Sequence, residues 1–199
     1  MPKRVDHEQR RRELTDAFGR VVARDGLGAA SYRAVAAEAD VSVKRVQYYF
    51  ETKAALLAEA LHQVGDRLVG RGIVLMSDLG PDPTPRELLK AATVGTLPVD
   101  DGSRLDLHLF YSFYVAAITD PDLASVEALQ SQEWTVSFVS DLIRQAQDLG
   151  QVAVDLDADH EGLVFMMAVY GLGLSVLAGH VTPQVATATI DRQLDRVFL

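Results

Sequence analysis

The chain has 199 residues, 48% hydrophobic and 24% charged, which is enough apolar material for one domain or one core with a small added module. It contains no cysteine, which excludes disulfides, thiolate nucleophiles and cysteine-ligated zinc. No run approaches the ~18 consecutive apolar residues of a membrane span, and residues 1–16 lack an apolar signal segment. We therefore expect a cytoplasmic protein that does not enter a membrane.

The charge is distributed unevenly along the chain. The net charge is −9, but residues 1–53 hold 11 Lys and Arg against 8 Asp and Glu. This gives a net charge of +3 for residues 1–53 and leaves −12 for residues 54–199. The division favours a basic module that meets a polyanion, joined to an acidic body that does not. Charge alone leaves open an ordinary solvated surface with chance unevenness.

The periodicity of the N-terminal segment is helical. Gly26 and Gly28 are expected to end a first helix. Its apolar side chains follow the i, i+4, i+7, i+8 spacing of one helix face: Leu14, Phe18, Val21 and Val22.

Two short helices are predicted next, over Tyr32–Ala39 and Val43–Tyr49. Ser31 and Ser42 are suitable N-caps for them, and Asp40 lies in the tight turn between them. Two short helices joined by such a turn form a helix-turn-helix, whose second helix fits the major groove of DNA.

The remainder of the chain also reads as helices, with a proline-rich linker over residues 80–85. No segment alternates with period 2 for long enough to predict a strand. The prediction is an all-α fold of about nine helices, of which the last six cover Lys53 to about Met76, 85–97, 102–119, 122–149, 157–179 and 183–198.

The predicted second helix of the helix-turn-helix carries the side chains suited to DNA. Arg and Lys pair with guanine, Gln with adenine, and Val contacts a thymine methyl. Hydroxyl and ammonium groups near the helix ends are suited to phosphates. The alternative is a buried helical hairpin with solvated charges, which adjacent tyrosines beside basic residues do not favour. The predicted DNA-binding residues are Ser31, Arg33, Val43, Lys44, Arg45, Gln47, Tyr48, Tyr49 and Lys53.

The stretch VSVKRVQYYFETKAALL (residues 41–57) resembles the signature of TetR-type transcriptional regulators. The segments HLFYSFYVAAITDPDLASV, LIRQAQDLGQVAVDLDAD and YGLGLSVLAG are similar to the C-terminal domain of the BetI-like branch. The resemblance implies a DNA-binding domain at residues 1–52 and a ligand-binding and dimerisation domain at residues 53–199. It also implies a homodimer on a pseudo-palindromic operator, usually a repressor, released by a small molecule.

Two positions depart from the signature. Its usual turn glycine is Asp40 here, and its usual tyrosine after the anchoring residue is Gln47. The second change puts the base preference in doubt, because an amide replaces an aromatic contact.

The last two predicted helices are suited to dimerisation. Helix 157–179 has small residues that permit close helix approach: Ala168, Gly171, Ser175 and Ala178. Helix 183–198 places apolar residues on one face: Ile190, Leu194, Val197 and Phe198. The resemblance favours an interchain four-helix bundle, and the alternative is packing within a monomer.

The acidic body is rich in aromatic residues and methionine between its ends. A cavity lined in this way, with a few polar tips, is the usual form of a small-molecule site, although each residue taken singly is more often plain core. The predicted effector-binding residues are His108, Tyr111, Tyr114, Trp134, Phe138, Met166 and Tyr170.

Catalytic and metal motifs are not apparent, so we expect no catalytic residue, metal or cofactor. The five histidines lack the i, i+3 or i, i+4 pairing that aims two ligands from one helix. Residues 155–162 superficially resemble a calcium loop, but they have His160 for its glycine and Met166 for its glutamate. Asp157 or Asp159 is instead expected to cap the next helix. The competing function is a helical small-molecule-binding protein or enzyme, whose basic module contacts an acidic protein.

Overall fold

The computed structural model describes residues 2–119 and 127–199, and in them the fold is all-α, as predicted. The described residues contain nine α-helices, one short 3-10 helix and no strand. The elements are α1 (Pro2–Asp25), η1 (Leu27–Ala29), α2 (Tyr32–Glu38), α3 (Val43–Tyr49), α4 (Lys53–Ser77), α5 (Pro85–Val94), α6 (Asp101–Ala117), α8 (Glu127–Asp148), α9 (Ala158–Leu177) and α10 (Pro183–Val197).

The helix boundaries follow local signals in the sequence. The hydroxyls of Ser31 and Ser42 accept hydrogen bonds from backbone N–H groups at the starts of α2 and α3. Asp157 caps α9, as expected. Gly26, with φ of 83°, follows the end of α1. The predicted break at Asp120-Pro121 and the first residues of predicted helix 122–149 lie outside the described residues.

The chain divides into two compact units, Met1–Asp66 with His108–Leu129, and Arg67–Leu107 with Gln130–Leu199. The division passes through α4, α6 and α8 rather than between helices. The functional boundary expected between residues 52 and 53 coincides with the start of α4, and it remains a prediction.

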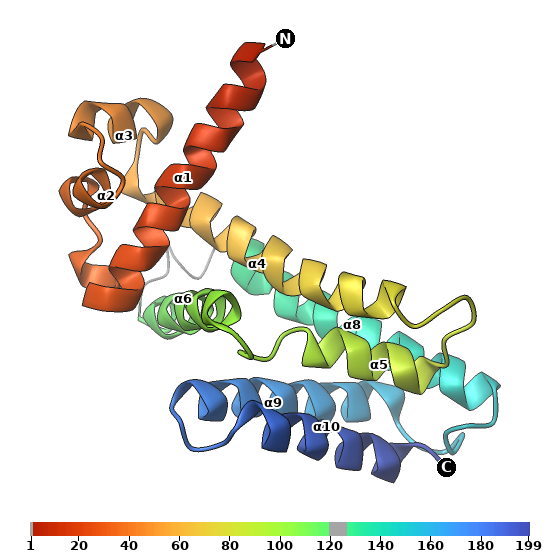
Figure 1. The fold of residues 1–199 in the computed structure, drawn as a ribbon. Helices are drawn as coiled ribbons and strands as arrows, with labels where there is room; N and C mark the ends of the chain where they lie inside the picture. The colour runs from red at the N-terminus through yellow and green to blue at the C-terminus, as the bar shows by residue number, and fades with distance from the viewer. Residues whose placement is uncertain (1, 120–126) are drawn as a thin grey trace. The chain divides into compact units, whose positions relative to one another are not determined.

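The core of the first unit is built on the predicted face of α1. Leu14, Phe18, Val21 and Val22 are all buried there. The same unit buries Val35 of α2, Val46 of α3 and Phe50, and Phe18 stacks on Phe113 with ring centroids 6.1 Å apart. The helix-turn-helix therefore rests on an apolar base made largely by α1 (Figure 1).

The core of the second unit is formed by α5, α8, α9 and α10. Figure 1 shows α9 and α10 side by side, and α10 also packs on α5. Leu89 of α5, Ile143 of α8, Phe165 of α9 and Ile190 of α10 all belong to this cluster.

The apolar face of α10 corrects one expectation. Ile190, Leu194 and Val197, which we predicted to meet a partner chain, are buried within this chain's own core, with Ile190 only 1% exposed. Phe198 packs against the same cluster. Any partner must therefore contact α10 from another face.

Helix α9 is long and apolar enough, by length and composition alone, to cross a membrane. A core helix passes the same test, and Phe165, Met166, Val169 and Val176 of α9 lie in the core of the second unit. Packing within this chain accounts for that face of α9 only, since 33% of its apolar window is buried.

Candidate DNA-binding surface and ligand-binding domain

Helices α2 and α3 are joined by a turn that depends on Asp40. This residue has φ of 52°, a left-handed conformation that Asp and Asn tolerate better than most non-glycine residues. The Val41 backbone N–H reaches back to the Ala36 carbonyl oxygen at 2.9 Å and closes the turn. Asp40 thus fills the role of the usual turn glycine.

Helix α3 buries one narrow face and exposes the rest. Val46 and the following Phe50 are buried, whereas Lys44 and Tyr48 lie one turn apart on the opposite side. The Tyr48 side chain is 74% exposed. The structure therefore presents α3 as a short helix with a polar and aromatic outer surface.

The structure places all nine predicted DNA-binding residues in the first unit. Val43 and Tyr49 are partly buried at the flanks of α3. The remaining seven are exposed, namely Ser31, Arg33, Lys44, Arg45, Gln47, Tyr48 and Lys53.

The cations of this unit fall into two groups. Arg20 and Arg24 of α1 both donate to the Glu38 carboxylate at 2.8 Å, and the hydrogen bonds from Arg24 and then Arg20 hold the pKa of Glu38 below its ordinary value. Arg11 of α1 pairs with Glu59 at 2.8 Å. In contrast, five exposed cations form no ion pair in the part of the chain that the structure describes: Arg12, Arg33, Lys44, Arg45 and Lys53.

The C-terminal end of α3 is tied to the body of the unit by side chains that sequence reasoning missed. Arg11 donates from Nη1 to the Tyr49 carbonyl oxygen at 2.8 Å, and its guanidinium lies 4.5 Å from the Phe50 ring centroid. The Tyr32 hydroxyl donates to the Phe50 carbonyl oxygen at 3.0 Å. These bonds satisfy carbonyls that a helix end otherwise leaves without partners. The sequence gives only a weak signal of the Arg11 contact, because Arg11 lies within a run of three arginines.

The seven predicted effector-binding residues belong to two sets. His108, Tyr111 and Tyr114 on α6 lie in the first unit, where the Tyr111 and Tyr114 rings both contact Phe110. Trp134 and Phe138 on α8, with Met166 and Tyr170 on α9, lie in the second unit.

The second set includes both exposed and buried members. Trp134 is 58% exposed and stacks on Phe138 with centroids 5.8 Å apart. Met166 is fully buried in the core, with Phe138 and Tyr170 packed against the same cluster. Met166 therefore contributes to packing, and the pocket as a whole remains a prediction.

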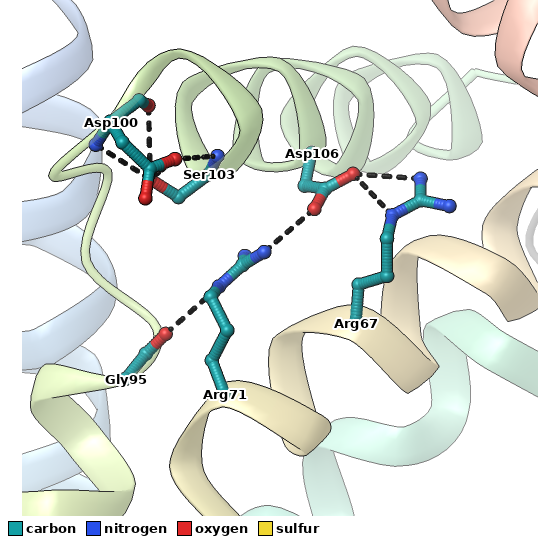
Figure 2. A network of polar contacts seen from close by, with 6 residues as sticks. All are labelled: Arg67, Arg71, Gly95, Asp100, Ser103 and Asp106. Carbon is teal, nitrogen blue, oxygen red and sulfur yellow. Dashed lines mark hydrogen bonds and ion pairs between the residues drawn. The ribbon is translucent and has the colours of Figure 1, made fainter. Parts of the chain in front are cut away.

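An ion cluster between α4 and α6 was also missed (Figure 2). Asp106 of α6 is 5% exposed, and its carboxylate accepts from Arg67 at 2.7 and 2.8 Å and from Arg71 at 2.8 Å. Arg71 also donates to the Gly95 carbonyl oxygen at 3.2 Å. Two guanidiniums one turn apart on α4 thus hold one buried carboxylate. The partners lie 39 and 35 residues apart, so helical spacing gives no signal of the contact.

Helix α9 exposes a second apolar face opposite its core face. Leu163, Val164, Met167 and Leu174 are 41–51% exposed, and the small residues Ala168, Gly171 and Ala178 are exposed among them. Ser175 is partly buried. A continuous apolar surface of this kind is typical of a protein interface.

No group of three or more His, Cys, Asp or Glu suited to a metal is present within residues 2–119 and 127–199. The acidic stretch 155–159 is used structurally, since Asp157 accepts from the backbone N–H groups of Asp159 and His160.

Comparison with known proteins identifies both halves of the chain. Residues 14–60 match the model for bacterial regulatory proteins of the tetR family, and residues 85–199 match that for the C-terminal domain of BetI-type transcriptional repressors. The chain is 26% identical over 178 residues to the transcriptional regulator PksA of Bacillus subtilis, covering 89% of this chain and 83% of PksA. It is also 26% identical over 132 residues to the regulator BetI of Stenotrophomonas maltophilia, covering 66% of each.

Solved structures agree in fold. A transcriptional regulator from Rhodococcus sp. Rha1 superposes with a TM-score of 0.79 at 27% identity, covering 94% of this chain and 95% of that one. A regulator from Saccharomonospora viridis in complex with choline gives a TM-score of 0.79 at 21% identity, covering 96% and 99%.

Proposed function

This chain belongs to the TetR family of transcriptional regulators, with a BetI-type C-terminal domain, and we propose that it is a cytoplasmic repressor that a small molecule releases from its operator. The acidic body is proposed to bind the effector and a second copy of the chain. The comparisons do not favour the competing function, a small-molecule-binding protein or enzyme whose basic module contacts an acidic protein.

The observation that carries the proposal is the unequal use of the cations in the first unit. Arg11, Arg20 and Arg24 of α1 are engaged with Glu59 and Glu38, whereas Arg33, Lys44, Arg45 and Lys53, like Arg12 of α1, are exposed without ion pairs in the described residues. Cations left uncompensated on one surface favour a polyanion, because counterion release supplies much of the free energy of DNA binding.

The residues of this surface are proposed to have two roles in DNA recognition, contact with base edges and contact with phosphates. Lys44, Arg45 and Gln47 on α3 are placed to contact base edges, and Val43 to contact a thymine methyl. Ser31, Arg33, Tyr48, Tyr49 and Lys53 lie at element ends and edges, where they hold phosphates and fix the register of α3.

Single variants test this division on a panel of duplexes that differ by one base pair in the operator. Tyr48→Phe and Lys53→Ala are expected to weaken binding to every duplex alike, because they lose phosphate contacts. Arg45→Ala is expected to relax the preference at one operator position, with a loss of roughly 1–3 kcal/mol on the preferred sequence. An equal loss on every duplex for Arg45→Ala contradicts its role as a base reader.

The effector is proposed to act through α4, which begins at the helix-turn-helix and reaches the Asp106 cluster. Arg67 and Arg71 anchor the C-terminal half of α4 to α6, and movement of α4 is the proposed route from the effector to the helix-turn-helix. Such a ligand releases DNA only if it binds more tightly to the conformation of the protein that does not bind DNA. A preference of about 1–3 kcal/mol lowers DNA affinity roughly 5- to 150-fold.

Dimerisation is proposed to use the last two helices, as the sequence indicated, but with a different face of α10. The exposed apolar face of α9, with Leu163, Val164, Met167 and Leu174, supplies the apolar contact. Val185, Ala188 and Arg192 of α10, exposed and spaced by about one turn each, lie away from its buried face and are available beside the apolar face of α9. A dimer doubles the few base pairs that one α3 reads. Its two-fold symmetry matches the two inverted half-sites of the pseudo-palindromic operator that the resemblance implies.

A further inference from the structure

Residues 7–13, in the first turns of α1, add no buried side chain to the apolar core. Helix α1 begins at Pro2, yet Leu14 is its first buried side chain among the described ones, which begin at residue 7. These turns extend past α3 (Figure 1). A helical extension of this length has an ordering cost that core burial does not offset. Its contacts with α3 indicate what it does instead.

Among the described side chains of this extension, His7 is the first that touches α3. Its ring centroid lies 4.8 Å from that of Tyr49 and 6.4 Å from that of Tyr48. Tyr48 and Tyr49 in turn meet edge to face, with centroids 5.1 Å apart and an interplanar angle of 87°. The three rings form one cluster, in the edge-to-face and tilted arrangements that aromatic pairs prefer.

His7 lies on a face of α1 whose residues contact the rest of the first unit along much of the helix. His7 and Arg11 are four residues apart, and Arg11 holds the Tyr49 carbonyl oxygen from the same face of α1. Below them this face continues into buried Leu14 and Phe18. One face of α1 therefore supports the first unit with apolar side chains and then α3 with Arg11 and His7.

We propose that His7 is a positioning residue for DNA binding, which holds the Tyr48 and Tyr49 rings in place on the recognition helix. The proposal rests on the function proposed above, in which these tyrosines hold phosphates. Tyr48 is mostly exposed, so without a ring contact its side chain must be ordered when DNA binds. Ordering it beforehand removes that cost from the binding step.

The operator is first identified by selecting the duplexes that the protein binds from a random DNA pool. The affinity for the selected inverted repeat is then measured for the wild-type protein, His7→Ala and His7→Phe. We expect His7→Ala to bind roughly 2- to 10-fold more weakly, the loss expected when one side chain must be ordered on binding. His7→Phe retains a ring and is expected to restore affinity. The dependence of affinity on salt should stay the same in all three, because His7 itself neutralises no phosphate. His62→Ala, at another exposed histidine of the same unit, is the matched control and is expected to bind as wild type does.

Two results overturn the proposal. One is unchanged affinity in His7→Ala. The other is a His7→Phe variant as weak as His7→Ala with a reduced salt slope, which means that the imidazole contacts DNA directly.

A measurement without DNA separates this proposal from the proposed function. The ring proton signals of Tyr48 and Tyr49 in the free protein are expected to shift in His7→Ala and not in His62→Ala, because only the first removes a neighbouring ring. Unchanged tyrosine signals contradict the ring cluster itself. Failure of the folded wild type to bind any duplex contradicts the proposed function instead, and leaves the ring measurement valid.

Discussion

Asp40 occupies a backbone conformation that glycine adopts without strain. With φ of 52° and an exposed side chain, it accepts a left-handed conformation at a position where the family usually has glycine. An L-residue pays roughly 1–2 kcal/mol in this region, and Asp somewhat less because its short side chain bonds locally. The turn that sets the angle between α2 and α3 is therefore slightly strained.

Replacing Asp40 by glycine relieves this strain. We expect Asp40→Gly to raise the free energy of unfolding by up to about 1 kcal/mol, the strain relieved being partly offset by the greater freedom of glycine in the unfolded chain. Asp40→Val should lower it, since a β-branched residue is poorly tolerated at positive φ. Urea unfolding measures both, and a destabilised Asp40→Gly contradicts the strain argument.

Asp157 makes the stability of the chain depend on pH. Hydrogen bonds from the backbone N–H groups of His160 and then Asp159 hold the pKa of this carboxylate below its ordinary value, although desolvation opposes them. The unfolded chain therefore binds this proton more readily than the folded chain. The contribution is present above the ordinary pKa of about 3.9 and is lost as the pH falls through that value towards the depressed one.

Serine in place of Asp157 can cap α9 with its hydroxyl, which does not titrate in this pH range. We expect Asp157→Ser to unfold with a shallower loss of stability than wild type as the pH is lowered from about 5 to 2, because its cap carries no such proton. Urea titrations at stepped pH give the two slopes. Parallel slopes contradict a role for this carboxylate.

Helices α4 and α5 approach so closely that only glycine fits where they meet. A Cβ on Gly95 would lie 2.6 Å from the backbone nitrogen of Gly72, and a Cβ on Gly72 would lie 3.1 Å from the Ala92 carbonyl oxygen. The Arg71 bond to the Gly95 carbonyl oxygen fixes the same junction. The obstacle is backbone, which cannot move aside as a flexible side chain can.

Alanine at this junction should force the helices apart. We expect Gly95→Ala to lower the free energy of unfolding by roughly 1–3 kcal/mol through overpacking. Gly70→Ala on the same α4 is the matched control, because nothing lies within 4 Å of its added Cβ. It should raise stability by up to about 1 kcal/mol through helix propensity. Equal effects of the two substitutions in thermal unfolding contradict the close approach.

The Asp106 cluster should be sensitive to loss of its carboxylate. Asp106→Asn leaves the guanidiniums of Arg67 and Arg71 beside each other without an anion, and we expect a loss of roughly 3 kcal/mol. That corresponds to about 6–12 °C in melting temperature for a chain of this size. Asp101→Asn, an exposed carboxylate on the same helix, should change stability by less than about 1 kcal/mol. Similar losses in both variants contradict the importance of the cluster.

The helices could be predicted from the sequence because their signals are local. Ser31, Ser42 and Gly26 mark helix ends within a few residues, and the α1 stripe has a clear period. The Asp106 cluster could not be predicted, since contacts between helices distant in sequence depend on how those helices pack. The stripe of Ile190 and Leu194 was recognised as apolar, but periodicity does not say whether its partner is the same chain or another. The same limit applies to the predicted effector-binding residues, because periodicity does not say which aromatic side chains share a site.

At the scale of the whole molecule, specific DNA binding requires two copies of the chain. One α3 reads too few base pairs for a specific site, and the exposed face of α9 offers apolar surface for a second copy. Leu174 and Met167, about half exposed, lie on this face. Residues 54–199 carry a net charge of −12, which disfavours contact between this part of the chain and DNA.

Charge placed on this face should separate the copies. We expect Leu174→Glu and Met167→Glu to sediment as monomers and to lose high-affinity binding to the inverted repeat, because like charges would be buried against each other. Val154→Glu, on a residue that is 83% exposed and outside α9 and α10, is the control and should remain dimeric. A Leu174→Glu protein that stays dimeric contradicts the assignment of this face.

The central claim is that the chain is a sequence-specific, dimeric DNA-binding protein. Selection of bound duplexes from a random DNA pool, by the folded, effector-free protein at near-physiological salt, tests it most directly. We expect enrichment of an inverted repeat, with half-sites separated by about one turn of DNA, roughly 34 Å. A pool that shows no enriched sequence contradicts it.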